Sequence, residues 1–134
     1  MNLEAAISSI MTTSIDCVTP DQKIIDIKHI YEQPQFHSHV PVNENGKVVG
    51  IVSIVNFMRA IHDASLDDNE TVYHEISVRD IMTPSPSTAS PKSTIREVAA
   101  VLSKGDFHSM LITEENELKG IVTTTDILKL MLKD

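Results

Sequence analysis

Two stretches of this chain carry a glycine, a hydroxyl and a polar side chain at the same spacing. The two sets are Gly50, Ser53 and Asn56, and Gly120, Thr123 and Asp126. A glycine lets a ligand approach the backbone closely. A hydroxyl at the start of a helix lies among free N–H groups that favour an anion such as phosphate. Because the Asp126 carboxylate can accept two hydrogen bonds from a vicinal diol, the pattern predicts a site for a phosphate and a ribose.

The same spacing has a second interpretation, because a hydroxyl and a polar side chain three residues apart also cap a helix. Such a capping box stabilises a helix by about 1 kcal/mol without any ligand. Capping is expected at Asp126 whether or not a ligand binds there. Asn56 departs from the pattern, since an amide has one acceptor oxygen and no charge. The site with Asn56 is therefore expected to be weaker or to differ in selectivity.

Both stretches belong to a longer internal repeat. Residues 10–12 (Ile-Met-Thr) recur 71 positions later at residues 81–83. An i, i+3, i+6 stripe of aliphatic residues that starts at Ile24 recurs with the same offset from Ile95, and each stripe indicates one helix face. The chain is therefore a tandem duplication.

Each copy predicts the order strand, helix, strand, strand, helix after a short lead-in helix. The first copy is predicted to hold a lead-in at 3–10, a strand at 16–18, a helix from Thr19-Pro20 to about Gln33, a hairpin of 39–42 with 48–52, and a helix from 53 to about 62. The matching ranges in the second copy are 78–82, 87–89, Ser90-Pro91 to about Lys104, 110–113 with 118–122, and 123 to about 132.

These elements predict an α+β fold, an α/β two-layer arrangement of two β-α-β-β-α repeats packed as a pseudo-twofold pair. The predicted domains are a first repeat with its lead-in helix at residues 1–63 and a second repeat at residues 77–134. Residues 64–76 between them are rich in acidic side chains, so we interpret them as a solvated acidic linker.

Composition narrows the classes of function. The 134 residues carry 11 basic and 19 acidic side chains, a net charge of −8, which repels nucleic acid and anionic lipid. The longest apolar run is far below the roughly 20 residues that span a bilayer. The one cysteine, Cys17, cannot form an internal disulfide, and residues 1–4 lack the features of a secretory signal. We expect a cytoplasmic protein that binds neither nucleic acid nor membrane.

The repeated motifs resemble those of the cystathionine-β-synthase (CBS) domain family, which occurs as tandem pairs. They are Ile-Met-Thr at 10–12 and 81–83, His-Val-Pro-Val at 39–42, and Gly-Ile-Val-Ser/Thr at 50–53 and 120–123. The resemblance covers nearly the whole chain. It implies a non-enzymatic sensor that binds AMP, ADP, ATP or S-adenosylmethionine in a cleft between the repeats. It also implies a homodimer, and signalling to a separate effector protein or a change of assembly.

The resemblance further implies roles for individual residues. It assigns the phosphate contact to Thr123 and the ribose contact to Asp126, with Ser53 and Asn56 at the matching positions. The other implied ligand-binding residues are Thr12, Thr83, Val18 and Ala89 near the base, and His39 and His108 near the phosphate. His39 would serve the Asp126 site and His108 the Asn56 site. Met11 and Met82 are expected in the core rather than at the ligand.

Two other functions remain open. One is a structural homodimerisation module with vacant sites. The other is a divalent-metal sensor that uses His37 and His39, although spacing identifies no third metal ligand. An enzyme is the least favoured class, because the sequence has no Gly-x-Ser-x-Gly, no Cys-x-x-Cys and no phosphate-binding glycine loop that ends in Lys-Ser/Thr.

Overall fold

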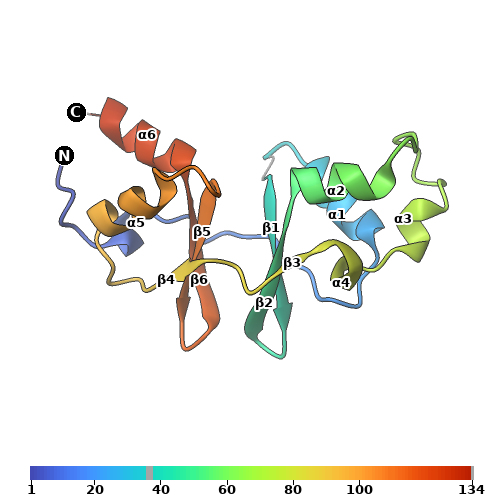
Figure 1. Ribbon diagram of the computed structural model, residues 1–134, viewed down its shortest axis with the longest axis horizontal. Helices are drawn as coiled ribbons and strands as arrows, with labels where there is room; N and C mark the ends of the chain where they lie inside the picture. The colour runs from blue at the N-terminus through green and yellow to red at the C-terminus, as the bar shows by residue number, and fades with distance from the viewer. Residues whose placement is uncertain (36–37, 134) are drawn as a thin grey trace. The chain divides into compact units, whose positions relative to one another are not determined.

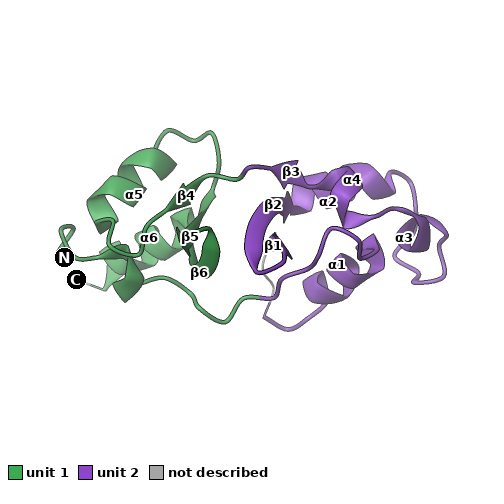
Figure 2. Cartoon of the chain, turned by 90° about the horizontal axis from the view of Figure 1, so that it is seen from below, with its two compact units in different colours: residues 1–15, 86–134 green, residues 16–85 purple. Residues whose placement is uncertain are grey.

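A computed structural model describes residues 1–35 and 38–133 of the chain (Figure 1). The chain divides into two compact units, and we name them as they are coloured in Figure 2. Unit 1 comprises residues 1–15 and 86–134, and unit 2 comprises residues 16–85. Each unit contains one three-stranded sheet.

Unit 2 builds its sheet in the order β1-β2-β3, with all pairs antiparallel. Its elements are α1 (Ile24–Tyr31), β1 (His39–Glu44), β2 (Lys47–Ser53), α2 (Ile54–Ile61), α3 (Val72–Glu75), α4 (Val78–Ile81) and β3 (Thr83–Pro84). The predicted opening strand is reduced to one parallel bridge between Val18 and Val42.

Unit 1 builds its sheet in the order β4-β5-β6, with β4 parallel to β5 and β6 antiparallel to it. Its elements are η1 (Ile7–Ser9), β4 (Thr88–Ala89), α5 (Ile95–Leu102), β5 (Ser109–Glu114), β6 (Glu117–Thr123) and α6 (Thr124–Leu132). The two units together confirm the predicted α+β fold of two β-α-β-β-α repeats. Over residues 1–35 and 38–133, every helix is too short or too polar to cross a bilayer.

The hairpin of each unit brings the end of its second strand to the start of a helix. In unit 2 His39 pairs with Ser53, and in unit 1 Ser109 pairs with Thr123. The tight turns are possible because both central residues of each turn have positive φ, with Gly46 at +80° in the first hairpin. Both hairpins and both closing helices were therefore predictable from local patterns.

The starts of the two long helices differ from the prediction. Thr19-Pro20 and Ser90-Pro91 were expected to open them, but α1 and α5 each begin four residues after the proline. The proline segments pair instead with the lead-in segments, because the carbonyl oxygens of Pro20 and Pro91 accept hydrogen bonds from the N–H groups of Arg79 and Ser8. A local capping pattern was thus overridden by long-range pairing.

The lead-in segment of each repeat joins the unit that the other repeat forms. Thr12 and Ile121 exchange two N–H···O hydrogen bonds of 2.9 Å in unit 1. In unit 2, Thr83 of β3 pairs with Ile51 of β2. The predicted boundaries follow the repeats along the sequence, whereas the compact units follow these strand pairings. No sequence pattern within either repeat predicts that the lead-in segments are exchanged between the units.

Residues 64–76 form part of unit 2, and the predicted solvated linker is not exposed along its whole length. Most of its acidic side chains are exposed, yet Tyr73 of α3 is fully buried. The ring of Tyr73 stacks on Phe57, with 6.2 Å between ring centroids, and its hydroxyl donates to the carbonyl oxygen of Ser65 at 2.7 Å. One aromatic side chain therefore attaches the linker to the core.

Gly50 and Gly120 make room for the lead-in methionines. A Cβ on Gly120 would lie 2.5 Å from Met11 Sδ and 3.0 Å from the carbonyl oxygen of Thr12. A Cβ on Gly50 would lie 2.6 Å from Met82 Sδ. The expectation that these glycines leave space for a ligand is corrected, because the thioethers fill that space. The core role expected for both methionines fits this packing.

We therefore expect Gly120→Ala to lower the free energy of unfolding by about 1 to 3 kcal/mol, the usual effect of overpacking. In a Met11→Ala background the added methyl group has more room, so its cost should fall. Urea unfolding of the two single variants and the double variant measures this coupling. Equal costs of Gly120→Ala in both backgrounds would contradict the proposed contact.

Candidate ligand-binding site

Thr123 and Asp126 form a reciprocal cap at the junction of β6 and α6. The Thr123 N–H donates to Asp126 Oδ2 at 2.9 Å, and the Asp126 N–H donates to Thr123 Oγ1 at 3.1 Å. The predicted capping box is confirmed. It uses one oxygen of the carboxylate. Among the described residues no hydrogen-bond partner is found for Asp126 Oδ1, which is the atom that a ribose hydroxyl could reach.

Ser53 and Asn56 form the matching cap at the start of α2, but with a different distribution of donors. The Ser53 N–H and the Ser53 hydroxyl both donate to Asn56 Oδ1, each at 2.9 Å, and the Asn56 N–H donates to Ser53 Oγ at 3.1 Å. Since the Ser53 backbone N–H requires an acceptor, the side-chain oxygen of Asn56 must face the cap. Asn56 therefore turns an NH₂ donor outward where Asp126 turns a carboxylate oxygen.

The two hydroxyls also differ. The Ser53 hydroxyl proton is used within its own cap, whereas Thr123 Oγ1 only accepts in the cap and keeps its proton for another acceptor. The junction in unit 1 thus offers one hydroxyl donor and one carboxylate acceptor, which suits a phosphate beside a diol. The junction in unit 2 offers an amide donor, which suits an acceptor-rich group.

The residues predicted near the base fall into both units. In unit 1, Thr12 is bridged to β6, the strand that ends at Thr123, and Ala89 lies in β4, which pairs with β5. Unit 2 brings Thr83 and Val18 into the sheet that carries the other cap.

Val18 is only 2% exposed, and both its backbone groups bond to β1. A ligand contact from Val18 stays a prediction.

The predicted histidines lie at the same junctions. His39 is the cross-strand partner of Ser53, and its Nδ1 lies 3.0 Å from the Ser38 hydroxyl oxygen. The carbonyl oxygen of His108 accepts the N–H of Thr124 at 3.0 Å, which places His108 beside the start of α6. That each histidine contacts the ligand bound by the other repeat stays a prediction. His37 lies outside the described residues.

One polar atom of unit 2 was missed by the sequence analysis. Asn43 Oδ1 is buried and has no hydrogen-bond partner within the part of the chain that the structure describes. The backbone N–H of Asn43 donates to Val18, next to the strand irregularity after Val42. A buried acceptor of this kind needs a water or ligand donor. Its only signal in the sequence is a polar residue directly after an apolar strand.

Comparison with known proteins places the chain in a family. The family model described as "CBS domain" matches residues 7–63 and 78–133, which is most of the chain. The chain belongs to the CBS domain family. The two matches correspond to the two repeats, so this is a CBS pair.

Solved CBS pairs share its fold. The structure of CBSX2 of Arabidopsis thaliana in complex with AMP is 20% identical, covers 96% of this chain and 97% of its own, and has a TM-score of 0.79. The CBS pair of protein MJ0100, in complex with 5′-methylthioadenosine and S-adenosyl-L-methionine, is 22% identical with a TM-score of 0.79, covering 96% of each chain. At these identities the likeness concerns the fold.

Relatives include longer proteins with catalytic domains. The inosine-5′-monophosphate dehydrogenase of Bacillus subtilis is 30% identical over 118 residues, which are 85% of this chain and 22% of the dehydrogenase. The chain spans less than half the length of the first curated relatives that it matches. The CBS pair is thus a part of these longer proteins.

The cap of the second CBS repeat is expected to stabilise the folded protein. Thr123→Ala removes the oxygen that accepts the Asp126 N–H, so it should lower the free energy of unfolding by about 1 kcal/mol. Thr123→Ser keeps that oxygen and should cost less. Thr125→Ala, at an exposed neighbouring position, is the matched control. Chemical unfolding of the three variants tests this, and a Thr123→Ala cost no larger than that of the control would contradict it.

Proposed function

We propose that this CBS pair is a non-enzymatic regulatory module that binds an adenine-containing ligand of the AMP, ADP, ATP or S-adenosylmethionine type. The observation that carries the proposal is the carboxylate oxygen of Asp126, which the cap leaves available at the start of α6. The AMP, 5′-methylthioadenosine and S-adenosylmethionine present in two solved CBS pairs support the ligand class.

The chemistry of the two junctions assigns the stronger site to unit 1. Asp126 Oδ1 accepts from a ribose hydroxyl, and the Thr123 hydroxyl donates to a phosphate oxygen. Asn56 cannot repeat the first contact because its oxygen is used in the cap. We expect an adenosine ligand to occupy the Asp126 site first, with Thr12 and Ala89 near the base.

A regulatory role also fits the longer relatives. In a CBS pair that binds a ligand without transforming it, the signal is a difference in ligand affinity between two arrangements of the protein. We propose that this module acts on a separate effector protein or through a change in its own assembly. The alternative without a ligand, a structural module, would show no thermal shift with AMP, ADP, ATP or S-adenosylmethionine.

Exchange of the two polar residues tests the site. Asp126→Asn should weaken AMP binding by about 10-fold or more, because a hydrogen bond to a charged group is lost. Its stability should change little, because Asn56 shows that an asparagine can make the same cap. Asn56→Asp should leave the first binding event unchanged and strengthen a second. Calorimetric titration with AMP measures both, and undiminished affinity of Asp126→Asn would refute the assignment.

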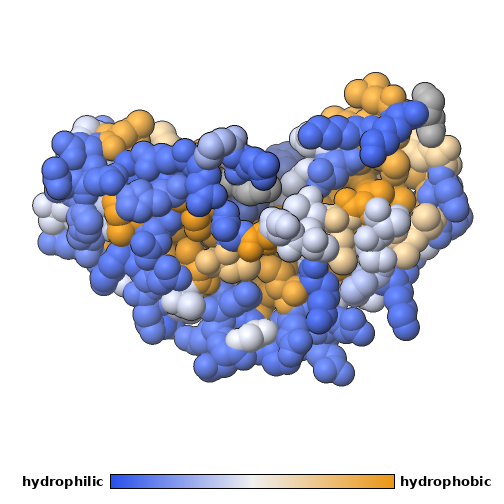
Figure 3. All heavy atoms as spheres, turned by 180° about the vertical axis from the view of Figure 1, so that it is seen from behind, coloured by the Kyte–Doolittle hydropathy of each residue, from blue (hydrophilic) through white to orange (hydrophobic). Residues whose placement is uncertain are grey.

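We also propose that the protein forms a homodimer through apolar faces on α2 and α6. The exposed side chains on these helices are Val55, Met58, Leu128, Met131 and Leu132, each at least 51% exposed. Figure 3 shows apolar surface at the upper right, in the region of α6. Apolar patches on soluble proteins mark interaction sites, and the corresponding helices of both CBS repeats carry one.

Leu128→Glu should therefore shift the protein from dimer to monomer in sedimentation velocity measurements, because a charge would be buried in the interface. Leu128 is exposed in the single chain, so the variant should keep its circular dichroism spectrum. Lys104→Glu, on an exposed residue after α5, is the matched control. A dimer that persists in Leu128→Glu at the same concentration would argue against this surface.

A further inference from the structure

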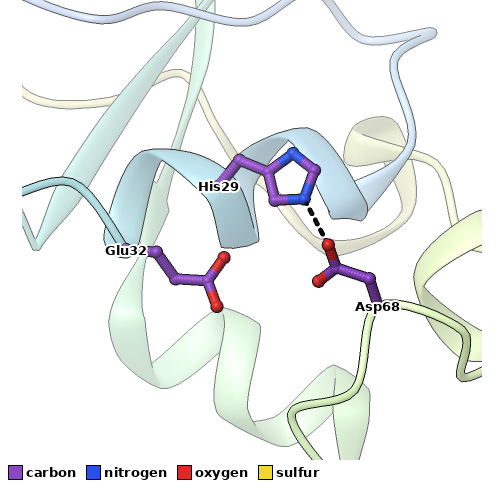
Figure 4. A group of neighbouring side chains, drawn as sticks. All are labelled: His29, Glu32 and Asp68. Atoms are coloured by element: carbon purple, nitrogen blue, oxygen red, sulfur yellow. Dashed lines mark hydrogen bonds and ion pairs between the residues drawn. The ribbon is translucent and has the colours of Figure 1, made fainter.

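Three exposed side chains converge on unit 2. His29 lies on α1, Glu32 follows the last residue of α1, and Asp68 belongs to the linker. Figure 4 shows them facing one another. One potential ligand atom from each lies within 4.8 Å of the others, and all three residues are exposed. The separation of three residues places His29 and Glu32 on the same side of the helix.

Lys28 orients the two carboxylates. It is only 3% exposed, and its Nζ donates to Asp68 Oδ1 at 2.5 Å and to Glu32 Oε2 at 2.7 Å. One oxygen of each carboxylate is therefore held by the ammonium group. Asp68 Oδ2 faces His29 instead, where it accepts the hydrogen bond from Nε2 at 2.9 Å. A partner that fixes one oxygen of a carboxylate leaves the other oriented for a ligand.

The charges of this cluster leave it negative. The hydrogen bonds to Asp68 and Glu32 raise the pKa of Lys28 to about 12, so its ammonium group stays charged. The hydrogen bonds from Lys28 and His29 lower the pKa of Asp68, which keeps that carboxylate ionised at neutral pH. The two carboxylates and the one ammonium group together give a charge of −1. A divalent cation is therefore attracted, although Lys28 reduces the attraction.

We infer that His29, Glu32 and Asp68 bind a divalent transition-metal ion of the Zn²⁺ class. An imidazole with two carboxylates suits Zn²⁺, whereas Ca²⁺ and Mg²⁺ prefer sets of oxygen ligands alone. Three protein ligands leave a fourth position of a tetrahedral site for water. This site is separate from the one first considered at His37 and His39, and it is independent of the proposed nucleotide site.

Binding requires one proton to move. Because an ionised carboxylate only accepts, the His29 Nε2 that faces Asp68 carries the hydrogen in the free protein. The metal takes the lone pair of this nitrogen, so the proton of a neutral imidazole shifts to Nδ1, and a protonated imidazole releases one proton to solvent.

A bound ion would also secure the linker. The loop with Asp68 would be joined to α1 by the metal as well as by Lys28, while Tyr73 holds the following helix in the core. A ligand that binds only the folded state stabilises it by mass action. Zn²⁺ should thus raise the melting temperature of the full chain, and the increase should grow with Zn²⁺ concentration.

The test is a calorimetric titration of the full chain with Zn²⁺ at neutral pH, with and without a competing chelator. His29→Ala and Glu32→Gln should each weaken binding by about 10-fold or more, as loss of a ligand or of its orientation does. Both residues are exposed, so both variants should fold, and Glu32→Gln keeps an oxygen for Lys28. His62→Asn is the control, because it removes another exposed imidazole that lies outside the cluster.

The outcomes separate this site from others. Weakened binding in both ligand variants, together with normal binding in His62→Asn, supports the inference. Full affinity in His29→Ala and Glu32→Gln overturns it, and loss of binding in His39→Ala alone would assign the ion to the other histidine pair. A titration without any heat or melting shift also overturns it.

Discussion

The close approach of each lead-in segment to the second strand of a hairpin is the constraint on which both units depend. Met11 packs where a Cβ of Gly120 would lie, and the adjacent Thr12 bonds to β6 in both directions. The same contact recurs between Met82 and Gly50. Without it each unit would lose the segment that pairs with its hairpin, so the glycines serve packing first. The lead-in of unit 1 also pairs with the strand that ends at Thr123, so the sheet beside that cap includes a segment from the start of the chain.

The caps at the ends of β2 and β6 stabilise the helix starts and also decide which polar atoms face outward. A capping box satisfies donors that a helix start would otherwise leave to solvent. The choice between aspartate and asparagine at its third position changes little in the cap but reverses what faces outward, from a carboxylate acceptor to an amide donor. Two repeats with the same backbone can therefore present different chemistry while each remains equally well capped.

The linker shows how one buried charge organises a polar segment. Lys28 is enclosed beneath the ring of Tyr73, with Nζ 5.5 Å from the ring centroid, and burial of an ammonium group is costly unless it is paired. Asp68 and Glu32 supply that pairing from the linker and from the end of α1. The acidic residues that suggested a solvated segment are thus partly counterions of a buried lysine. Their arrangement around His29 follows from this requirement.

Local sequence patterns are enough to predict the repeat, the hairpins, the closing helices and the caps at Thr123 and Ser53. These depend on residues close in the chain, whose period, turn chemistry and spacing act locally. Local patterns do not predict which lead-in joins which unit, the start of α1 four residues after Pro20, or the burial of Tyr73. They also do not predict the contact of His29 with Asp68, 39 residues away. Such contacts depend on how distant segments pack, and no local pattern encodes that packing.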